Sequence, residues 1–322
     1  MVSDNVRVRE VGLRDGLQII RAFLPTEHKK TWIDHCSKAG FQEIEATSFV
    51  PAKYIPQFVD AAEIVAHATA KPHLQVAAFT PNVKGAELAL AAGVHKITCV
   101  VSSTESFNQA NLRRSRADSL RDAKDIIRLR NEGHGNRRVV VQGALSSAFG
   151  CPFEGIVSDK IILELLRELL KVGVDEISVA DTVGYANPTQ VRRLCRAILR
   201  ETGDLPVGLH LHDTRGTGLA NVLAGLDAGI RYFDSSLGGL GGCPNAPRAT
   251  GNITTEDLVY MLEAMGLNTG IDMDVLFKTR EFVRRQLPDV PMFGHIADAG
   301  LPKGFHPAQS QGPISSDKKA SR

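Results

Sequence analysis

Two histidines separated by one residue are the sharpest chemical signal in the sequence. They stand in His210-Leu211-His212-Asp213, at the end of the apolar segment 207–212. Residues two apart on a strand point to the same side, so both imidazoles face one direction. Such a pair suits a divalent cation, and an aspartate with an amide oxygen would complete a mixed nitrogen and oxygen shell. The alternative is that one or both histidines only form hydrogen bonds in the protein interior.

Other reactive side chains also come where predicted strands end. Arg14 and Asp15 follow the first strand. Glu45 and Ser48 close the second, and Asp181 follows the sixth. Because the active site of a parallel barrel lies at the carboxyl ends of its strands, these residues are predicted to share one rim with the histidines. Taken singly, Arg14 and Asp15 could be a salt-bridged surface turn, and Asp181 could cap the next helix.

A glycine-rich loop follows the last predicted strand and carries a cysteine. It reads Gly238-Gly239-Leu240-Gly241-Gly242-Cys243-Pro244, and Asn252 lies further along the same connection. A segment with so little bulk can close over a site and bring a thiol with it. Cys243 could instead be an ordinary small loop residue. A phosphate cradle is disfavoured, because the GK[ST] ending of that motif is missing.

A regular alternation of strands and helices positions these residues. The predicted strands are 6–11, 43–49, 74–79, 96–101, 138–143, 176–180, 207–212 and 231–235. The clearest helical patterns are 26–39, 83–92, 159–172, 188–200 and 214–228. Eight strand–helix units at a spacing of roughly 40 residues predict an α/β fold of the (β/α)8 TIM-barrel class. An open doubly wound sheet is the second choice, since it usually has fewer strands and a glycine-rich first turn.

An Ala-Gly or Val-Gly pair ends several of the predicted helices just before a strand. Glycine there is predicted to adopt the left-handed conformation that ends a helix and turns the chain back. The four occurrences are Ala39-Gly40, Ala92-Gly93, Val172-Gly173 and Ala228-Gly229.

Composition bounds the class of protein. The 322 residues are 43% hydrophobic and 23% charged, which is typical of a soluble globular protein. The formal net charge is +2. This balance gives no reason to expect nucleic acid or a membrane surface as partner. No secretory signal or membrane-spanning run is visible. The five cysteines are widely spaced and fit neither a disulfide framework nor paired zinc ligands, which favours a reducing, cytoplasmic location.

The organisation predicted from these patterns is one barrel domain and a tail. Residues 1–300 are expected to form the barrel. Residues 301–322 are rich in Pro, Gly, Ser, Gln and Lys, and a segment with so little apolar surface is expected to be a short flexible tail.

The combined motifs resemble those of 3-hydroxy-3-methylglutaryl-CoA (HMG-CoA) lyases, which belong to a superfamily of barrel metallolyases with the isopropylmalate, homocitrate and citramalate synthases. The resemblance begins at Glu10-Val11-Gly12-Leu13-Arg14-Asp15-Gly16-Leu17-Gln18 and covers nearly the whole chain apart from the tail. It is densest over residues 210–270, and the GGCP sequence points to the lyases rather than the synthases. The synthases also generally carry a further region of substantial length, which this chain leaves little room for.

The resemblance implies a metal-dependent carbon–carbon lyase that cleaves HMG-CoA to acetoacetate and acetyl-CoA, as in leucine degradation. A homo-oligomer, dimer or tetramer, is also implied, with an acyl-CoA as substrate partner. The implied ligands of Mg²⁺ or Mn²⁺ are Asp15, His210, His212 and Asn252. The implied catalytic residues are Arg14, Asp181, Cys243 and Glu10, and the implied substrate-binding residues are Arg14, Gln18 and Ser48, with Glu45 as a further acidic position near the site.

Several positions depart from the lyase pattern. Ile19-Ile20 follows Gln18 where the lyases usually have Asn or Ser and then Glu, and Arg215 stands where a tyrosine is common. Asn245 and Pro247-Arg248 alter the glycine-rich loop. These changes leave a related substrate open, such as citramalyl-CoA cleaved to pyruvate and acetyl-CoA. A paralogue that binds acyl-CoA or metal without turnover is a further alternative, although every expected ligand position is retained.

The CoA site is left open by the sequence. Arg113, Arg114 and Arg116 follow the fourth strand and could meet the CoA phosphates. They could equally be the solvated start of a helix.

Overall fold

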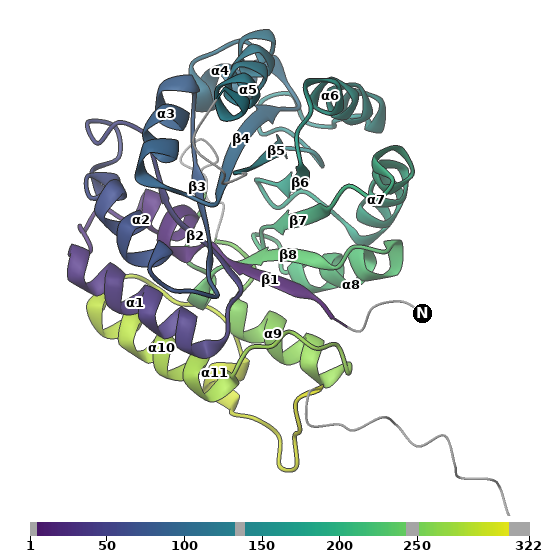
Figure 1. Ribbon diagram of the computed structural model, residues 1–322. Coiled ribbons are helices and arrows are strands. Elements are labelled where there is room, and N and C mark those ends of the chain that lie inside the picture. The colour runs from purple at the N-terminus through teal and green to yellow at the C-terminus, as the bar shows by residue number, and fades with distance from the viewer. Residues whose placement is uncertain (1–4, 133–138, 243–250, 309–322) are drawn as a thin grey trace, which may run out of the picture.

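Eight parallel strands close into a barrel in chain order. The structure, a computed structural model, describes residues 5–132, 139–242 and 251–308. Each strand pairs with the next, and β8 pairs with β1, while the helices surround the barrel (Figure 1). The strands are β1 (Arg7–Glu10), β2 (Glu43–Ser48), β3 (Gln75–Phe79), β4 (Lys96–Ser102), β5 (Val140–Ser146), β6 (Glu176–Asp181), β7 (Val207–Leu211) and β8 (Tyr232–Ser235). The predicted TIM barrel is confirmed.

The helices follow the strands, and three more come after β8. They are α1 (Thr26–Ala39), α2 (Ala61–Thr69), α3 (Val83–Ala92), α4 (Glu105–Leu112), α5 (Arg116–Asn131), α6 (Asp159–Val172), α7 (Pro188–Thr202), α8 (Gly218–Ala228), α9 (Thr255–Ala264), α10 (Met273–Gln286) and α11 (Ile296–Ala299). Helix α10 packs along α1, so the end of the chain reinforces its beginning (Figure 1). Among these helices, none combines the length and hydropathy needed to cross a bilayer.

The predicted helix ends at glycine are confirmed. Gly40, Gly93, Gly173 and Gly229 follow α1, α3, α6 and α8 with φ of 96°, 87°, 88° and 111°. Two other boundaries differ from the prediction by about three residues or more, the start of α8 and the end of β5. Helix α8 begins at Gly218 rather than Thr214, because Asp213 accepts a hydrogen bond from the Gly218 N–H at 2.7 Å and holds the residues between them in a turn.

Strand β5 runs on to Ser146, past the glycine at which the prediction ended it. Gly143 lies inside the strand because α6 packs closely there. A Cβ on Gly143 would lie 3.0 Å from Leu169 and 3.2 Å from Val174. This glycine serves close packing rather than a turn. The extra residues bring Ser146 to the rim of the barrel.

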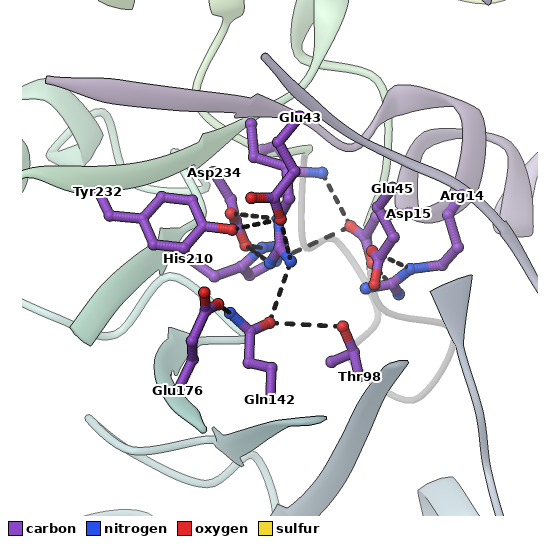
Figure 2. Close-up of polar contacts among 12 residues, drawn as sticks. Arg14, Asp15, Glu43, Glu45, Thr98, Gln142, Glu176, His210, Tyr232 and Asp234 are labelled. Atoms are coloured by element: carbon purple, nitrogen blue, oxygen red, sulfur yellow. Dashed lines mark hydrogen bonds and ion pairs between the residues drawn. The ribbon is translucent and has the colours of Figure 1, made fainter. Parts of the chain in front are cut away.

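The interior of the barrel is polar. TIM barrels usually fill this space with layers of branched aliphatic side chains. Here it holds a network of buried ion pairs and hydrogen bonds (Figure 2). Lys96 Nζ lies 2.8 Å from Glu43 Oε1 and 2.5 Å from Glu176 Oε2. The network's members are Arg9, Glu43, Lys96, Gln142, Glu176, Tyr232 and Asp234.

The aliphatic core lies instead between the barrel and its helices. Ile44, Val76 and Ile97 on the strands are fully buried, as are Trp32 and Ile64 on the helices.

The start of the predicted tail also has contacts. The Phe305 ring packs on Tyr260, and Ala308 N–H donates to Glu263 on α9 at 2.7 Å. Residues 309–322 lie outside the described residues, and the division at residue 300 stays a prediction.

Candidate metal centre and active site

A cavity of about 360 Å³ opens at the carboxyl ends of the strands. Asp15, His210 and His212 line one side of it. Tyr54 from the loop after β2 and Arg113 from the end of α4 also line it. The cavity is therefore where the strand ends predicted it, and its lining contains charged, polar and aromatic side chains.

Asp15, His210 and His212 form a compact cluster. Their nitrogen and oxygen donor atoms lie within 4.8 Å of one another, and all three side chains are buried. The Nε2 atoms of the two histidines are 3.1 Å apart, and Asp15 Oδ2 lies 3.7 Å from His212 Nε2 and 4.0 Å from His210 Nε2. The predicted convergence of these residues is confirmed, because their donor atoms point toward a common centre.

Asn252 lies at the edge of this cluster. It forms an isolated bridge with His212, and its Nδ2 donates to Asp15 Oδ2 at 2.8 Å. Two buried polar atoms here, Asn252 Oδ1 and His212 Nδ1, have no hydrogen-bond partner among the described residues. The unpaired amide oxygen of Asn252, beside a carboxylate and two imidazoles, completes a donor set that a divalent cation would satisfy. The residues present therefore fit a metal ion.

Arg14 joins the cluster to a buried carboxylate. It lies on the π-helical turn η1 (Gly12–Gly16), a rare conformation that often marks functional sites. Arg14 Nη1 is 2.7 Å from Asp15 Oδ1, Nε is 2.5 Å from Glu45 Oε2, and the guanidinium stacks over Phe79 at 5.0 Å. Burial alone would raise the pKa of Asp15, but the nearby charges of Arg14, His210 and His212 hold it well below its usual range. Asp15 is thus ionised at neutral pH.

Asp234, paired with Arg9, contacts the ring nitrogen of His210 that is remote from Asp15 and His212. The Nδ1 of His210 lies 3.1 Å from Asp234 Oδ2, and Asp234 is paired with Arg9 through both oxygens, at 2.8 and 2.6 Å. Burial lowers the pKa of His210, but the hydrogen bond with Asp234 and the charges of Asp15 and Asp234 outweigh it and raise that pKa. Asp234 and Arg9 were not identified from the sequence. The sequence did contain a signal for Asp234. Side chains alternate along a strand, so Asp234 on β8 faces the barrel interior, on the same side as Tyr232 and opposite to Phe233.

Gln18 and Ser48 differ in where they lie. Gln18 lines the cavity and donates to Asp15 Oδ1 at 2.8 Å, so it is placed to meet a ligand. Ser48 is buried and its Oγ accepts a hydrogen bond from Val50 N–H at 3.2 Å. Among the described residues that line the cavity are Val50 and Pro51, but not Ser48. Its substrate-binding role stays a prediction.

Asp181 lies behind the cavity wall. Its two oxygens accept hydrogen bonds from Tyr185 N–H at 2.7 Å and Ala186 N–H at 3.0 Å, in the turn before α7. Its neighbours Ala180 and Thr182 line the cavity, whereas Asp181 is not among the described lining residues. Burial raises the pKa of Asp181. The sequence left open whether this residue caps the next element, and the structure does show it organising that turn.

Glu10 is also behind the site. Its Oε1 accepts from Gly12 N–H at 2.8 Å and Leu237 N–H at 3.0 Å, and its Oε2 accepts from Thr255 Oγ1 at 2.6 Å. It therefore ties the turn that carries Arg14 to the loop after β8. The catalytic role implied for Glu10 stays a prediction. Burial raises its pKa to about 8.

Replacing Glu10 with glutamine is expected to flatten the pH dependence of stability. The unfolded chain ionises Glu10 near pH 4.3, but the folded chain keeps it protonated up to about pH 8. Its contribution is therefore present at low pH and lost as pH rises through that window, by a few kcal/mol. Glutamine keeps the acceptor oxygen and has no such ionisation. Urea unfolding of both proteins at pH 5 to 9 measures this, and parallel curves would contradict it.

The loop after β8 is anchored at its base. Gly238 N–H donates to both oxygens of Glu256, at 3.1 and 3.0 Å, and Glu256 pairs with Arg280 of α10 at 3.1 Å. A Cβ on Gly238, whose φ is 61°, would lie 2.9 Å from Met292. Helices α9 and α10 thus fix where this loop starts. Cys243, like Asn245, Pro247 and Arg248, lies outside the described residues.

Two positions that depart from the lyase pattern are not on the cavity wall. The described lining residues include neither Ile19 nor Arg215. Arg215 donates to Val183 O at 3.1 Å and Gly184 O at 2.8 Å, and its guanidinium stacks over Tyr185. It therefore joins the loops after β6 and β7. The described cavity therefore gives neither Ile19 nor Arg215 a role in the choice of substrate.

The three arginines after β4 are separated by the structure. Arg113 lines the cavity, with φ of 55° and its guanidinium 4.8 Å above the Tyr54 ring. Arg114 is turned away and pairs with Asp122 at 2.7 Å. Arg116 begins α5, where its N–H donates to Glu105 at 3.1 Å. Arg113 alone among these three borders the cavity.

The comparison with known families agrees with this geometry. The HMGL-like family model matches residues 5–283, which is most of the chain. The chain belongs to the HMGL-like family.

Named members of the HMGL-like family resemble this chain over most of its length. The hydroxymethylglutaryl-CoA lyase of Bacillus subtilis is 38% identical over 88% of this chain and 93% of its own length. The mitochondrial enzyme of Bos taurus is 38% identical over 88% of this chain and 86% of its own. A solved HMG-CoA lyase from Acinetobacter baumannii, in complex with coenzyme A and 3-methylmalate, has a TM-score of 0.89 at 39% identity, covering 95% of this chain and 99% of that one.

Proposed function

We propose that this protein is a divalent-metal-dependent carbon–carbon lyase that cleaves HMG-CoA to acetoacetate and acetyl-CoA. The observation that carries the proposal is the cluster of Asp15, His210 and His212 beside Arg14, all of which line the cavity. Support also comes from family membership and from HMG-CoA lyases 36–38% identical over most of the chain.

The reaction is a retro-Claisen cleavage, in which a base removes the proton of the tertiary hydroxyl and the bond to the carbon next to the thioester breaks. Asp181 is the base that the resemblance favours, and burial raises its pKa, but its two oxygens accept backbone N–H groups and it lies behind the cavity wall. A site histidine is the alternative, because His210 and His212 border the cavity directly.

The other residues orient the substrate and hold the charge that develops. When bound at Asp15, His210, His212 and Asn252, Mg²⁺ or Mn²⁺ supplies Lewis acidity that lowers the pKa of the hydroxyl. Arg14, fixed by Glu45, stabilises the enolate oxygen of the product, a type of interaction often worth about 3–4 kcal/mol. Gln18 is placed to contact the acyl group. The proposal makes Cys243 the proton donor to the enolate carbon.

Arg113 is proposed to meet the CoA phosphates at the cavity mouth. Arg113→Ala is expected to raise KM for the acyl-CoA by about tenfold with little change in kcat, because a contact remote from the reacting bond contributes to binding in ground state and transition state alike. Arg114→Ala is the matched control, since its guanidinium faces Asp122, and its KM should stay within about twofold. Steady-state kinetics of both variants decide this, and equal KM values would remove Arg113 from the CoA site.

The test of the function is product analysis with two substrates in parallel, HMG-CoA and citramalyl-CoA, with Mg²⁺ and with chelator. Acetoacetate and acetyl-CoA formed only with the metal support the proposal. Pyruvate and acetyl-CoA would keep the mechanism and change the substrate. Neither product from a protein that binds metal would favour a non-catalytic paralogue. A homo-oligomer and a cytoplasmic location belong to the same proposal, and sedimentation and cell fractionation test them.

A further inference from the structure

Asp234 stands where the candidate metal cluster meets the polar network of the barrel interior. It lies on β8, is buried, and contacts His210 on one side and Arg9 on the other. Figure 2 shows His210 lying against Asp234, with Glu43, Gln142 and Glu176 further along the network. The two histidines of the cluster are therefore in different surroundings, because the Nδ1 of His212 has no partner in the described part of the chain.

The pairing with Arg9 makes Asp234 an acceptor only. Arg9 donates from Nε to Oδ1 at 2.8 Å and from Nη2 to Oδ2 at 2.6 Å, the two-pronged geometry of a guanidinium and an ionised carboxylate. An ionised carboxylate has no proton to donate, so the contact of 3.1 Å between Oδ2 and His210 requires Nδ1 of His210 to carry the hydrogen. The ring's other nitrogen, Nε2, then has its lone pair toward Asp15 and His212.

Arg9 is in turn kept in place by the rest of the network. Its Nη1 donates to Gln142 Oε1 at 3.0 Å and lies 3.4 Å from Glu43 Oε1. Gln142 in turn donates a hydrogen bond to Glu176, and Glu43 accepts one from Lys96. Arg9 therefore has little freedom to turn away from Asp234, and Asp234 has little freedom to turn away from His210.

We propose that Asp234, clamped by Arg9, is a positioning residue that fixes His210 as the Nδ1–H tautomer with Nε2 directed at the metal. The proposal rests on the proposed metal site and goes beyond it, because it assigns a role to a residue outside the proposed set of ligands. A ligand histidine whose second nitrogen donates to a carboxylate is correctly oriented and more basic, and losing the carboxylate typically costs about 10–100-fold in metal affinity.

Replacing Asp234 with asparagine tests this role. The amide has nearly the same shape, but its NH2 can donate to Nδ1 and so favour the opposite tautomer, in which Nε2 carries the hydrogen and cannot bind a metal. The Kd for Mn²⁺, measured by the electron paramagnetic resonance of the free ion, is expected to rise about 10–100-fold. Glu176→Gln is the control: it removes a charge from the same network without touching Asp234 or His210, and its Kd should stay within about twofold of the native value.

A second measurement needs no variant. Nitrogen-15 NMR of the histidine rings in the native protein with Mg²⁺ is expected to show Nδ1 of His210 protonated, and an unprotonated Nδ1 overturns the proposal even if Asp234→Asn fails to fold. Equal Mn²⁺ affinities of Asp234→Asn and the native protein also overturn it, as do equal losses in Asp234→Asn and Glu176→Gln. No Mn²⁺ binding by the native protein at all would instead refute the metal site on which the proposal rests.

Discussion

Replacing Lys96 with methionine is expected to lower the free energy of unfolding by about 3–5 kcal/mol, the usual cost of removing one partner from a buried ion pair. Lys96 is fully buried on β4 and faces two carboxylates, those of Glu43 and Glu176, which are themselves 0% and 8% exposed. Methionine has a similar length and no charge, so it would fill the space and leave two buried anions with fewer partners. The barrel interior then contains an uncompensated negative charge.

The measurement is urea unfolding at neutral pH followed by circular dichroism. Lys84→Met provides the matched control, because Lys84 is 76% exposed on α3 and pairs with Glu87 of the same helix. Exposed pairs of this kind contribute about 0–1 kcal/mol, so the control should unfold near the native midpoint. Equal midpoints for Lys96→Met and the native protein would show that the interior network contributes nothing to stability.

Replacing His212 with alanine is expected to lower kcat/KM by about a thousandfold or more and to weaken Mn²⁺ binding. The change removes one of three buried donor groups that converge within 4.8 Å, and the Lewis acidity of a bound cation is worth several kcal/mol. The loss of affinity should exceed the 10–100-fold expected when only a supporting residue is removed. Activity that stays lost at saturating Mn²⁺ would add a second role for His212, such as that of the base.

His67→Ala is the control for this experiment. It makes the same chemical change on α2, where His67 pairs with Asp34 at 2.7 Å on the outside of the barrel. Metal titration and steady-state kinetics should find it within about twofold of the native protein. A His212→Ala protein with native Mn²⁺ affinity and native turnover would remove His212 from the site.

The fold could be predicted from local patterns. The segment 159–172 shows helical periodicity that ends at Gly173, and the structure has α6 over those residues. The strands alternate apolar residues that pack on the helices, such as Ile44 and Ile97, with polar residues in the barrel interior, such as Glu43 and Lys96. Such signals depend on near neighbours in the chain, so they are visible without any knowledge of the tertiary structure. Where a local signal was misread, as at Gly143, the cause was a packing contact with Leu169 from another element.

The candidate site could be predicted only in part. The positions of Asp15, His210 and His212 followed from the rule that strand ends share one rim, and the structure brings them together. Asp234 and Arg9 were missed because a charged residue in the middle of a strand has no local sign of its partner. Their pairing joins β1 to β8, 225 positions apart in the chain.

The sequence by itself determined the class of fold, the family and the residues able to hold a metal, because each depends on residue type and short-range spacing. Only the tertiary structure decided which of those residues face the cavity, which lie behind it and what surrounds each. Arg113 and Arg114 are adjacent in sequence, yet one borders the cavity and the other faces Asp122. Likewise, Thr182 borders the cavity, whereas the adjacent Asp181 lies behind its wall. The physical reason is that the environment of a side chain, and with it the pKa and hydrogen bonding, is set by elements that meet only when the barrel closes.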